Sequence, residues 1–293
     1  MSKMVGWKLV LAMVVVVALL VGCGKGNGNE QSEQQSNAQS EQPAPEAAQP
    51  EQKEEEAEPA PEPEQPVVPA EIKTYVHWDF DGLEDGGDIP DTAGEGAGFK
   101  AIQVDGNGWV VSNNPQDWAA FYMGVSDENG DEIFLENFAV ETSMYLPEDN
   151  DGLTNDGGIP LFVAAEGRYD ASIHFGEGGK GTMNLWKAGN TDGGPILTSN
   201  AEQFPDRGAV AEFTLLPGQE YVYTIIGTHR KDADDNEFVQ LRFYIDDTLI
   251  VDGEVPYWRG GFGLRGWQSA IRYDYLKVSD APLTAPDGTA VYE

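Results

Sequence analysis

The chain of 293 residues has little of several things that proteins use to fold or to bind partners. It contains one cysteine, so no disulfide forms within it and the folded part must be stabilised by packing. It has 17 lysines and arginines against 51 aspartates and glutamates, a net charge of −34. Without a basic patch it cannot displace the counterions of a phosphate backbone, which excludes nucleic-acid binding. No segment has convincing helical periodicity, so a helical domain is not expected.

Long apolar runs are also scarce, and the one near the amino terminus extends from Leu9 to Val21 after Lys3 and Lys8. It is too short to span a bilayer, which needs about 20 apolar residues, and its length suits a secretory signal. The residues Leu20-Val21-Gly22-Cys23 at its end resemble the lipobox of bacterial lipoproteins. That resemblance implies cleavage of a signal peptide at residues 1–22, lipid on Cys23, and a membrane-anchored, extracytoplasmic protein.

Residues 23–70 have the composition of a disordered tether. They are rich in Gln, Ser and Asn and then in Pro, Glu and Ala, and beyond alanine their only aliphatic residues are Val67 and Val68. Such a segment buries too little apolar surface to offset the entropy of ordering it. The acidic excess continues beyond it, because residues 71–293 hold 13 basic and 40 acidic residues, a net charge of −27.

From residue 71 onwards the pattern changes to that of short strands. Val239, Leu241, Phe243 and Ile245 alternate with polar or aromatic residues, which is typical of a strand with one buried face. We expect a turn at Asp246-Asp247, an all-β antiparallel β-sandwich over residues 71–282 and a loose tail at 283–293. The expected strands are 75–80, 101–111, 119–123, 138–146, 159–165, 169–175, 182–187, 221–226, 238–245, 249–251, 260–265 and 271–278.

The last five of these strands carry a family resemblance. The segments YVYTIIG (221–227), VQLRFYIDDTLIVDG (239–253), GGFGLRG (260–266) and IRYDYLKVSD (271–280) resemble the closing half of concanavalin A-like lectin/glucanase domains, laminin-G-like ones included. A looser match extends back to about residue 72. The resemblance implies a jelly-roll sandwich, a fold that hosts lectins, glycosidases and adhesion modules, so it does not by itself name a function.

Alternation also predicts which side chains face solvent. If Met144, Ile173, Leu185 and Phe243 face the core, the opposite side chains suit sugar recognition, since a pyranose stacks on an aromatic ring while its hydroxyls need fixed donors and acceptors. The predicted carbohydrate-binding residues are Trp186, Tyr145, Tyr244, His174, Asn184, Arg242 and Glu141. The resemblance implies glycan binding on such an exposed face. The alternative is that these are scattered or shielded surface residues.

No catalytic set is recognised. Glucanases of this fold carry Glu-x-Asp-x-Glu, and the nearest match, Glu132 to Glu136, has Phe134 in place of the central aspartate. Trp118, Tyr257, Trp258 and Trp267 lie near loops and form either plugs at the ends of the sandwich, which we favour, or a second aromatic rim.

A structural Ca²⁺ is the one cofactor that the sequence suggests. Asp79, Asp81 and Asp274 meet if the first and last strands pair, and carboxylate oxygens suit calcium; solvated charge is the alternative. The sequence therefore favours a surface lipoprotein whose sandwich binds a cell-wall or extracellular glycan without catalysis. Two alternatives stay open: a sugar-acting hydrolase or lyase of the same fold, and a structural or protein-interaction module.

Overall fold

A computed structural model describes residues 71–89, 98–112, 118–148, 156–164, 167–176, 179–189, 194–256 and 259–292. Its named elements are all strands, and every pairing between them is antiparallel, which confirms the expected fold class. Within these ranges no helix is long and apolar enough to cross a membrane. The predicted signal peptide, Cys23 and the predicted tether lie outside the described residues.

The strands form two large sheets and one small one. The nine-stranded sheet has the order β14 (Thr248–Pro256), β13 (Glu237–Ile245), β12 (Glu220–Lys231), β7 (Asn137–Tyr145), β16 (Arg272–Tyr273), β3 (Asn107–Ser112) and β2 (Phe99–Val104), with β17 (Leu276–Asp280) also beside β7 and β1 (Thr74–Trp78) beside β17. The six-stranded sheet has the order β11 (Leu197–Thr198), β10 (Gly181–Lys187), β9 (Gly167–Phe175), β8 (Asp156–Ala164), β15 (Gly261–Trp267) and β4 (Trp118–Met123). The small sheet pairs β5 (Val125–Ser126) with β6 (Glu132–Ile133).

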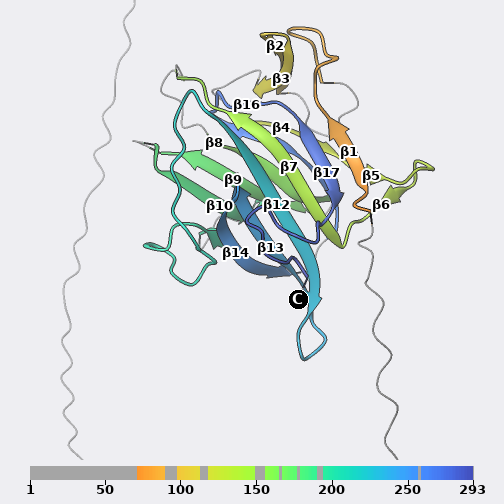
Figure 1. The fold of residues 1–293 in the computed structure, drawn as a ribbon, viewed down its shortest axis with the longest axis vertical. Helices are drawn as coiled ribbons and strands as arrows, with labels where there is room; N and C mark the ends of the chain where they lie inside the picture. Colours follow the sequence, from red (N-terminus) through yellow and green to blue (C-terminus); the bar gives the residue numbers. More distant parts are fainter. Residues whose placement is uncertain are drawn as a thin grey trace, which may run out of the picture. The chain divides into compact units, whose positions relative to one another are not determined.

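The core lies between the two large sheets. In Figure 1, β7, β12 and β17 of the nine-stranded sheet cross in front of β8, β9 and β10 of the six-stranded sheet. One continuous apolar cluster joins them, to which Val140 and Phe243 contribute from one side and Ile173 and Leu185 from the other. The alternation read from the sequence therefore gives the inward direction correctly in both sheets.

The predicted turn at Asp246-Asp247 is confirmed, whereas the predicted single strand at residues 271–278 is wrong. Asp246-Asp247 forms the turn between β13 and β14, where Ile245 pairs with Thr248. The expected single strand 271–278 is instead divided into β16 and β17. At the break the Thr142 hydroxyl donates to the carbonyl of Tyr275 at 2.5 Å, so a side chain takes the place of part of the ladder with β7.

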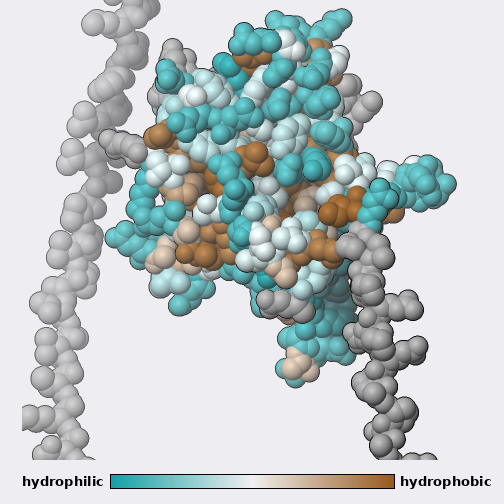
Figure 2. All heavy atoms as spheres, viewed as in Figure 1, coloured by the Kyte–Doolittle hydropathy of each residue, from teal (hydrophilic) through white to brown (hydrophobic). Residues whose placement is uncertain are grey.

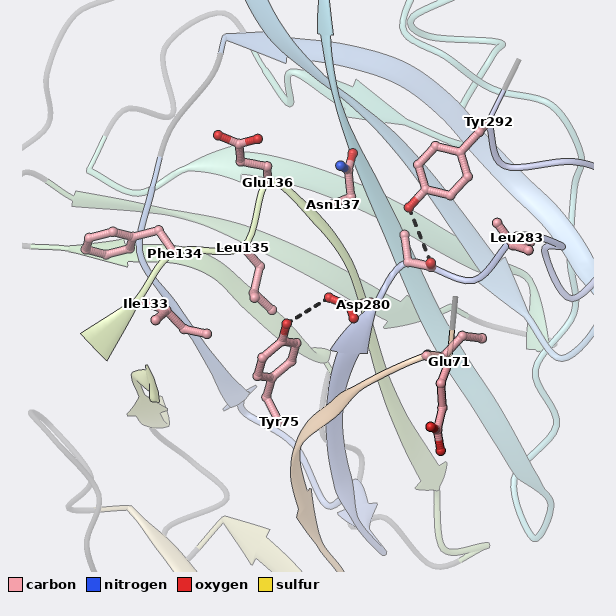
Figure 3. A pocket seen from close by; sticks show the side chains of 12 residues that line it. Glu71, Tyr75, Ile133, Phe134, Leu135, Glu136, Asn137, Asp280, Leu283 and Tyr292 are labelled. Atoms are coloured by element: carbon pink, nitrogen blue, oxygen red, sulfur yellow. Dashed lines mark hydrogen bonds between the residues drawn. The ribbon is translucent and has the colours of Figure 1, made fainter. Parts of the chain in front are cut away.

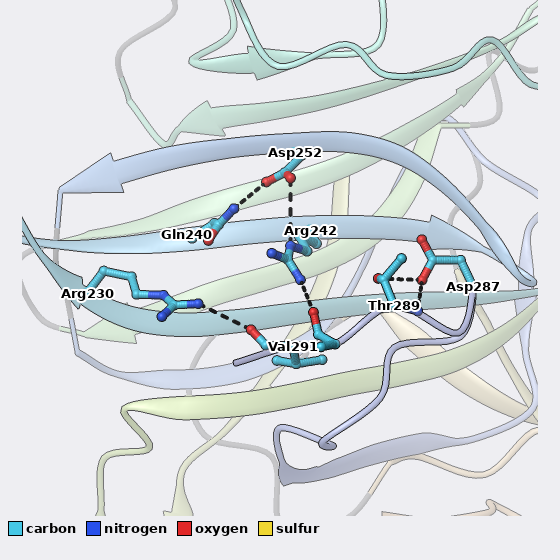
Figure 4. A network of polar contacts seen from close by, with 8 residues as sticks. Arg230, Gln240, Arg242, Asp252, Asp287, Thr289 and Val291 are labelled. Carbon is cyan, nitrogen blue, oxygen red and sulfur yellow. Dashed lines mark hydrogen bonds and ion pairs between the residues drawn. The ribbon is translucent and has the colours of Figure 1, made fainter. Parts of the chain in front are cut away.

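The carboxyl-terminal segment is packed rather than loose. Ala285 and Val291 are buried in a second apolar cluster with Ala139, Ile226 and Tyr244 on the outer side of the nine-stranded sheet. Two arginines of that sheet hold the segment through its backbone, as Figure 4 shows: Arg230 donates to the carbonyl of Val291 at 3.2 Å and Arg242 to that of Ala290 at 3.1 Å.

The face seen in Figure 2 is mostly hydrophilic, as the acidic composition predicts, with hydrophobic groups between the charged ones. One such group lies beside β1 and β6.

Candidate functional site

The seven predicted sugar-binding residues are divided between two faces that point in opposite directions. Glu141, Tyr145, Arg242 and Tyr244 belong to β7 and β13 of the nine-stranded sheet, whereas His174, Asn184 and Trp186 belong to β9 and β10 of the six-stranded sheet. Because the core lies between the sheets, the two groups cannot line one site. The expectation of a single site is wrong, since alternation gives the direction of a side chain within its sheet but not the sheet to which its strand belongs.

The group on the nine-stranded sheet has partners within the protein. The expected exposure of Tyr244 is wrong, because the carboxyl-terminal segment covers this side chain completely. Glu141 accepts a hydrogen bond from the Tyr275 hydroxyl at 2.9 Å and lies 3.7 Å from the Lys277 ammonium. Arg242 holds the carboxyl-terminal segment, as described above.

Tyr145 is half-buried and also has partners within the protein. Its ring centroid is 6.1 Å from that of Trp109, and the Arg272 guanidinium lies over the ring at 5.5 Å. The four predicted residues on the nine-stranded sheet therefore all contact other parts of the protein.

The outer face of the six-stranded sheet brings charged and aromatic side chains together. The register places Asp156 of β8 opposite His174 of β9 and Trp267 of β15. Farther along, Asp170 of β9 lies opposite Trp186 of β10. Their neighbours on these strands, such as Ile173, point into the core, so these side chains share the outer face.

A cavity of about 350 Å³ lies on this face. Trp186 and Trp267 both line it, and the exposed fraction of Trp267 is 45%. The remaining lining residues are Asp156, Arg168, Asp170, Lys187, Ala188, Gly189 and Arg265. The volume lies within the range of about 300–1,000 Å³ that is usual for small-ligand sites.

Two arginine–aspartate pairs provide the polar part of the cavity. The Arg265 Nη2 atom lies 3.2 Å from Asp156 Oδ1, and the Arg168 Nε atom donates to Asp170 Oδ1 at 2.9 Å. Arg265 and Asp170 are nearly buried, with exposed fractions of 4% and 7%. Groups held in this way present donors and acceptors in fixed directions.

The pKa of the Asp156 carboxyl in this cavity is raised above its ordinary value. Burial raises its pKa, because water no longer stabilises the charged form, and the charge of Asp170 acts in the same direction. Arg265 and His174 favour the carboxylate but do not compensate for burial, so the net shift is upward.

A buried tyrosine from the other sheet positions Arg265. The Tyr273 hydroxyl donates to the carbonyl of Arg265 at 2.6 Å and accepts from the backbone N–H of Gly158 at 2.7 Å. The space it occupies requires glycine at position 157, where a Cβ atom would lie 2.3 Å from the Tyr273 hydroxyl oxygen. Tyr273 thus crosses the core and fixes β15 against β8 beneath the cavity.

The sequence predicted Trp186 and His174 on an outer face but did not point to Asp156, Asp170, Arg168 or Arg265. Asp156 precedes the strand expected at residues 159–165, and Trp267 was expected as a plug at the end of the sandwich. A signal was present in β15, where Phe262 and Leu264 alternate with Gly263, Arg265 and Trp267. Tyr257 and Trp258 lie outside the described residues.

The motif nearest to the glucanase pattern does not contribute to this cavity. Glu132 lies on β6, and Phe134 and Glu136 lie on the connection to β7, where the exposed fraction of Phe134 is 45%. Phe134 and Glu136 line a different groove, described below.

Within the described ranges no three His, Cys, Asp or Glu side chains are arranged to hold a metal ion. Asp81 instead accepts a hydrogen bond from the N–H of Gly108 at 2.7 Å, and Asp79 accepts one from the N–H of Asp81 at 3.3 Å. Burial, followed by the charges of Glu220, Asp81 and Asp79, raises the pKa of Asp274. Calcium binding by Asp79, Asp81 and Asp274 stays a prediction.

Comparison by sequence gives no match: neither a protein-family model nor a curated protein is similar to the chain. Comparison by structure does give matches. The alginate lyase Aly36B is 10% identical, with 69% of this chain and 95% of the lyase covered at a TM-score of 0.42. The marine PL-14 alginate lyase from Aplysia kurodai is 7% identical, with 70% and 98% covered at a TM-score of 0.43. A glycoside hydrolase family 16 endo-glucanase from Bacteroides ovatus is 12% identical, with 69% and 99% covered at a TM-score of 0.36. At these identities the likeness is one of fold alone.

Proposed function

We propose that the outer face of the six-stranded sheet binds carbohydrate, in the cavity bordered by Trp186 and Trp267. The observation that carries the proposal is that two tryptophans line one cavity together with two arginine–aspartate pairs. Indole rings provide flat apolar surfaces for the C–H faces of sugar rings. The fixed polar groups provide partners for the hydroxyls.

The charge of the domain as a whole favours a sugar without many negative charges. Residues 71–293 carry a net charge of −27, which disfavours the approach of a polyanion. Within the cavity Arg168 and Arg265 are each matched by an aspartate, and Lys187 is a further cation of the lining outside these pairs. A neutral glycan does not meet the repulsion of the acidic domain.

Sugar hydrolysis or elimination at the same face is the second candidate function. It is favoured by one observation: Asp156, whose pKa is raised, shares the face with Asp170 and His174, and all three are groups that transfer protons in enzymes. A carboxyl that keeps its proton to higher pH is suited to act as a general acid.

Fluorescence titration of the chain with a panel of glycans tests the proposal. Trp186→Ala and Trp267→Ala are each expected to weaken binding at least about tenfold, which corresponds to roughly 1.4 kcal/mol. Phe134→Ala is the matched control, because Phe134 is as exposed as Trp267 but belongs to another groove. Unchanged affinity in both tryptophan variants rules out this site.

Product analysis on the same glycans separates the two functions. Release of new reducing ends that stops in Asp156→Asn establishes an enzyme, whereas binding without release establishes a lectin-like module. A chain that binds no glycan and instead captures a protein supports the interaction-module alternative.

We further propose that the protein is a lipoprotein, anchored outside the cytoplasm through lipid on Cys23. Support comes from the sequence alone, in the apolar run and the Leu20-Val21-Gly22-Cys23 motif. Two acyl chains on one cysteine suffice for stable anchoring, where one is marginal.

A further inference from the structure

A second cavity, of about 510 Å³, lies at one side of the sandwich, away from the proposed sugar site. Figure 3 shows Ile133, Phe134 and Leu135 on one side of Asp280, and Leu283 and Tyr292 on the other. We call it the side groove; its lining residues are Glu71, Ile72, Tyr75, Ile133, Phe134, Leu135, Glu136, Asn137, Asp280, Ala281, Leu283 and Tyr292.

The side groove concentrates exposed apolar surface. Among the described residues seven large hydrophobic side chains are exposed, and four of them line this groove: Ile72, Phe134, Leu283 and Tyr292. The hydrophobic group seen beside β1 and β6 in Figure 2 lies at this place. A cluster of this kind marks a contact surface rather than scattered exposure.

We propose that the groove is filled by a segment of the same chain, Val67-Val68-Pro69, at the end of the tether. The first reason is where the chain enters the domain. Glu71 and Ile72 themselves line the groove. The backbone of Lys73 is fixed beside them, because its N–H donates to Asp280 Oδ2 at 3.2 Å and its carbonyl accepts from the Asp280 N–H at 2.9 Å. The described part of the chain therefore begins at the edge of the groove, directly after residues 65–70, which contain the proposed segment.

The second reason is composition. Val67 and Val68 are the only aliphatic residues other than alanine between Gly24 and Ala70. A tether that only spans distance has no need of them, and burial of a valine side chain contributes roughly 1.5–3 kcal/mol. Pro66 and Pro69 flank the pair and restrict the backbone, which lowers the entropy lost when the segment is held in place.

The third reason is charge. The groove is bordered by the carboxyl groups of Glu71, Glu136 and Asp280, so an acidic segment is repelled. Residues 65–70, QPVVPA, carry no charge, whereas residues 51–64 contain seven glutamates. Within the tether, the last six residues are the uncharged stretch that contains aliphatic side chains larger than alanine. Their docking would place the boundary between tether and domain near Gln65 instead of Ala70.

Disulfide trapping tests the contact. In the full chain carrying Cys23→Ser, which removes the only native thiol, Val68→Cys is paired with Leu283→Cys. Glu64→Cys with Leu283→Cys is the control for chain proximity. Position 64 is twice as far along the chain from Ile72 as position 68 is. Chain length alone therefore makes disulfide formation at position 68 about threefold faster than at position 64. Docking predicts that the intramolecular disulfide at position 68 forms at least about tenfold faster.

A third pair, Val68→Cys with Val210→Cys, controls for exposure, because Val210 is 54% exposed and lies outside the groove. A rate for the 68–283 pair that exceeds the 64–283 rate by no more than about threefold, or that only equals the 68–210 rate, overturns the proposal. A disulfide that forms chiefly between two chains also overturns it, since a second copy is then the occupant.

Hydrogen exchange gives an answer that does not depend on engineered cysteines. In the chain with Val67→Asp and Val68→Asp, the amides of residues 133–136 are expected to exchange several-fold faster than in the unaltered chain. Exchange that does not change there contradicts docking, whatever the sugar site does, because the two sites share no lining residue.

Discussion

At the scale of single residues, the cavity depends on groups that are costly to bury and are therefore held by others. Asp156 is placed beside Arg265, whose own position is fixed by the Tyr273 hydroxyl. The pair does not offset the loss of water around Asp156, and the pKa of its carboxyl rises. A carboxyl buried in this way lowers stability when it is charged, which agrees with the role proposed for this face.

The raised pKa makes stability depend on pH in a defined direction. In the folded protein Asp156 holds its proton above the usual value of 3.8. The folded state therefore binds more protons between the usual and the raised pKa, and the free energy of unfolding falls as pH rises through this interval. Asp156→Asn is expected to flatten this fall, as measured by urea unfolding at a series of pH values.

Asp127→Asn is the control, because the pKa of Asp127 is shifted in the opposite direction. Backbone N–H groups of Asn129 and Asp131 donate to Asp127 and lower its pKa, so its contribution is present at neutral pH and lost as pH falls. The comparison uses the slope against pH, because either substitution also shifts stability by a constant. If Asp156→Asn gives a curve parallel to that of the unaltered chain, the carboxyl is not perturbed.

At the scale of elements, the sequence predicts well to which side of its strand a side chain points. It predicts poorly which strands lie beside one another in a sheet. On β10, Met183 and Leu185 are buried while Asn184 and Trp186 are partly exposed, as their alternation predicts. The same reasoning placed Glu141 and Arg242 together with Trp186, although β7 and β13 belong to the other sheet. Pairing between strands distant in sequence is decided by packing of the whole domain, which a local period of two does not contain.

The sequence predicted a loose tail at residues 283–293, and this prediction is wrong for a related reason. It contains proline and glycine and has no strand pattern. Its attachment depends on Arg230 and Arg242, which bind backbone carbonyls and so leave no trace in the sequence of the segment. Val291 is the one conspicuous signal, an aliphatic residue that is fully buried near the end of the chain.

Val291→Asp is expected to destabilise the protein by about 2 kcal/mol or more, since it removes a buried valine and places a charge against Ile226 and Tyr244. Ala290→Asp adds the same charge at the exposed neighbouring position, where changes are usually within about 0.5 kcal/mol. Thermal unfolding followed by circular dichroism distinguishes them. Equal melting temperatures for the two variants would mean that the segment contributes nothing to the fold.

At the scale of the whole molecule, composition excludes more than it identifies. The net charge predicts that nucleic acid is not a partner, and the single cysteine excludes a disulfide within the chain, without any knowledge of the fold. The strand patterns over residues 71–282 predict a sandwich, and the structure confirms it. Each of its two large sheets has an outer face. Which of the two faces is free depends on the carboxyl-terminal segment, a feature that only the structure reveals.

The proposed division into signal, tether and domain leads to a prediction about the amino terminus. When the full chain is produced in bacteria, mass spectrometry is expected to find residue 23 as the first residue, carrying at least two acyl chains, because one chain binds membranes only marginally. Cys23→Ser removes the thiol that accepts lipid and is expected to abolish labelling by a radioactive fatty acid. Gly22→Ala is the matched control, since it keeps both the thiol and a small residue before it, and its labelling should persist. An unlabelled native chain that still begins at Met1 would show that Leu9 to Val21 acts as an uncleaved apolar segment instead, and that the neighbourhood of Cys23 is incidental.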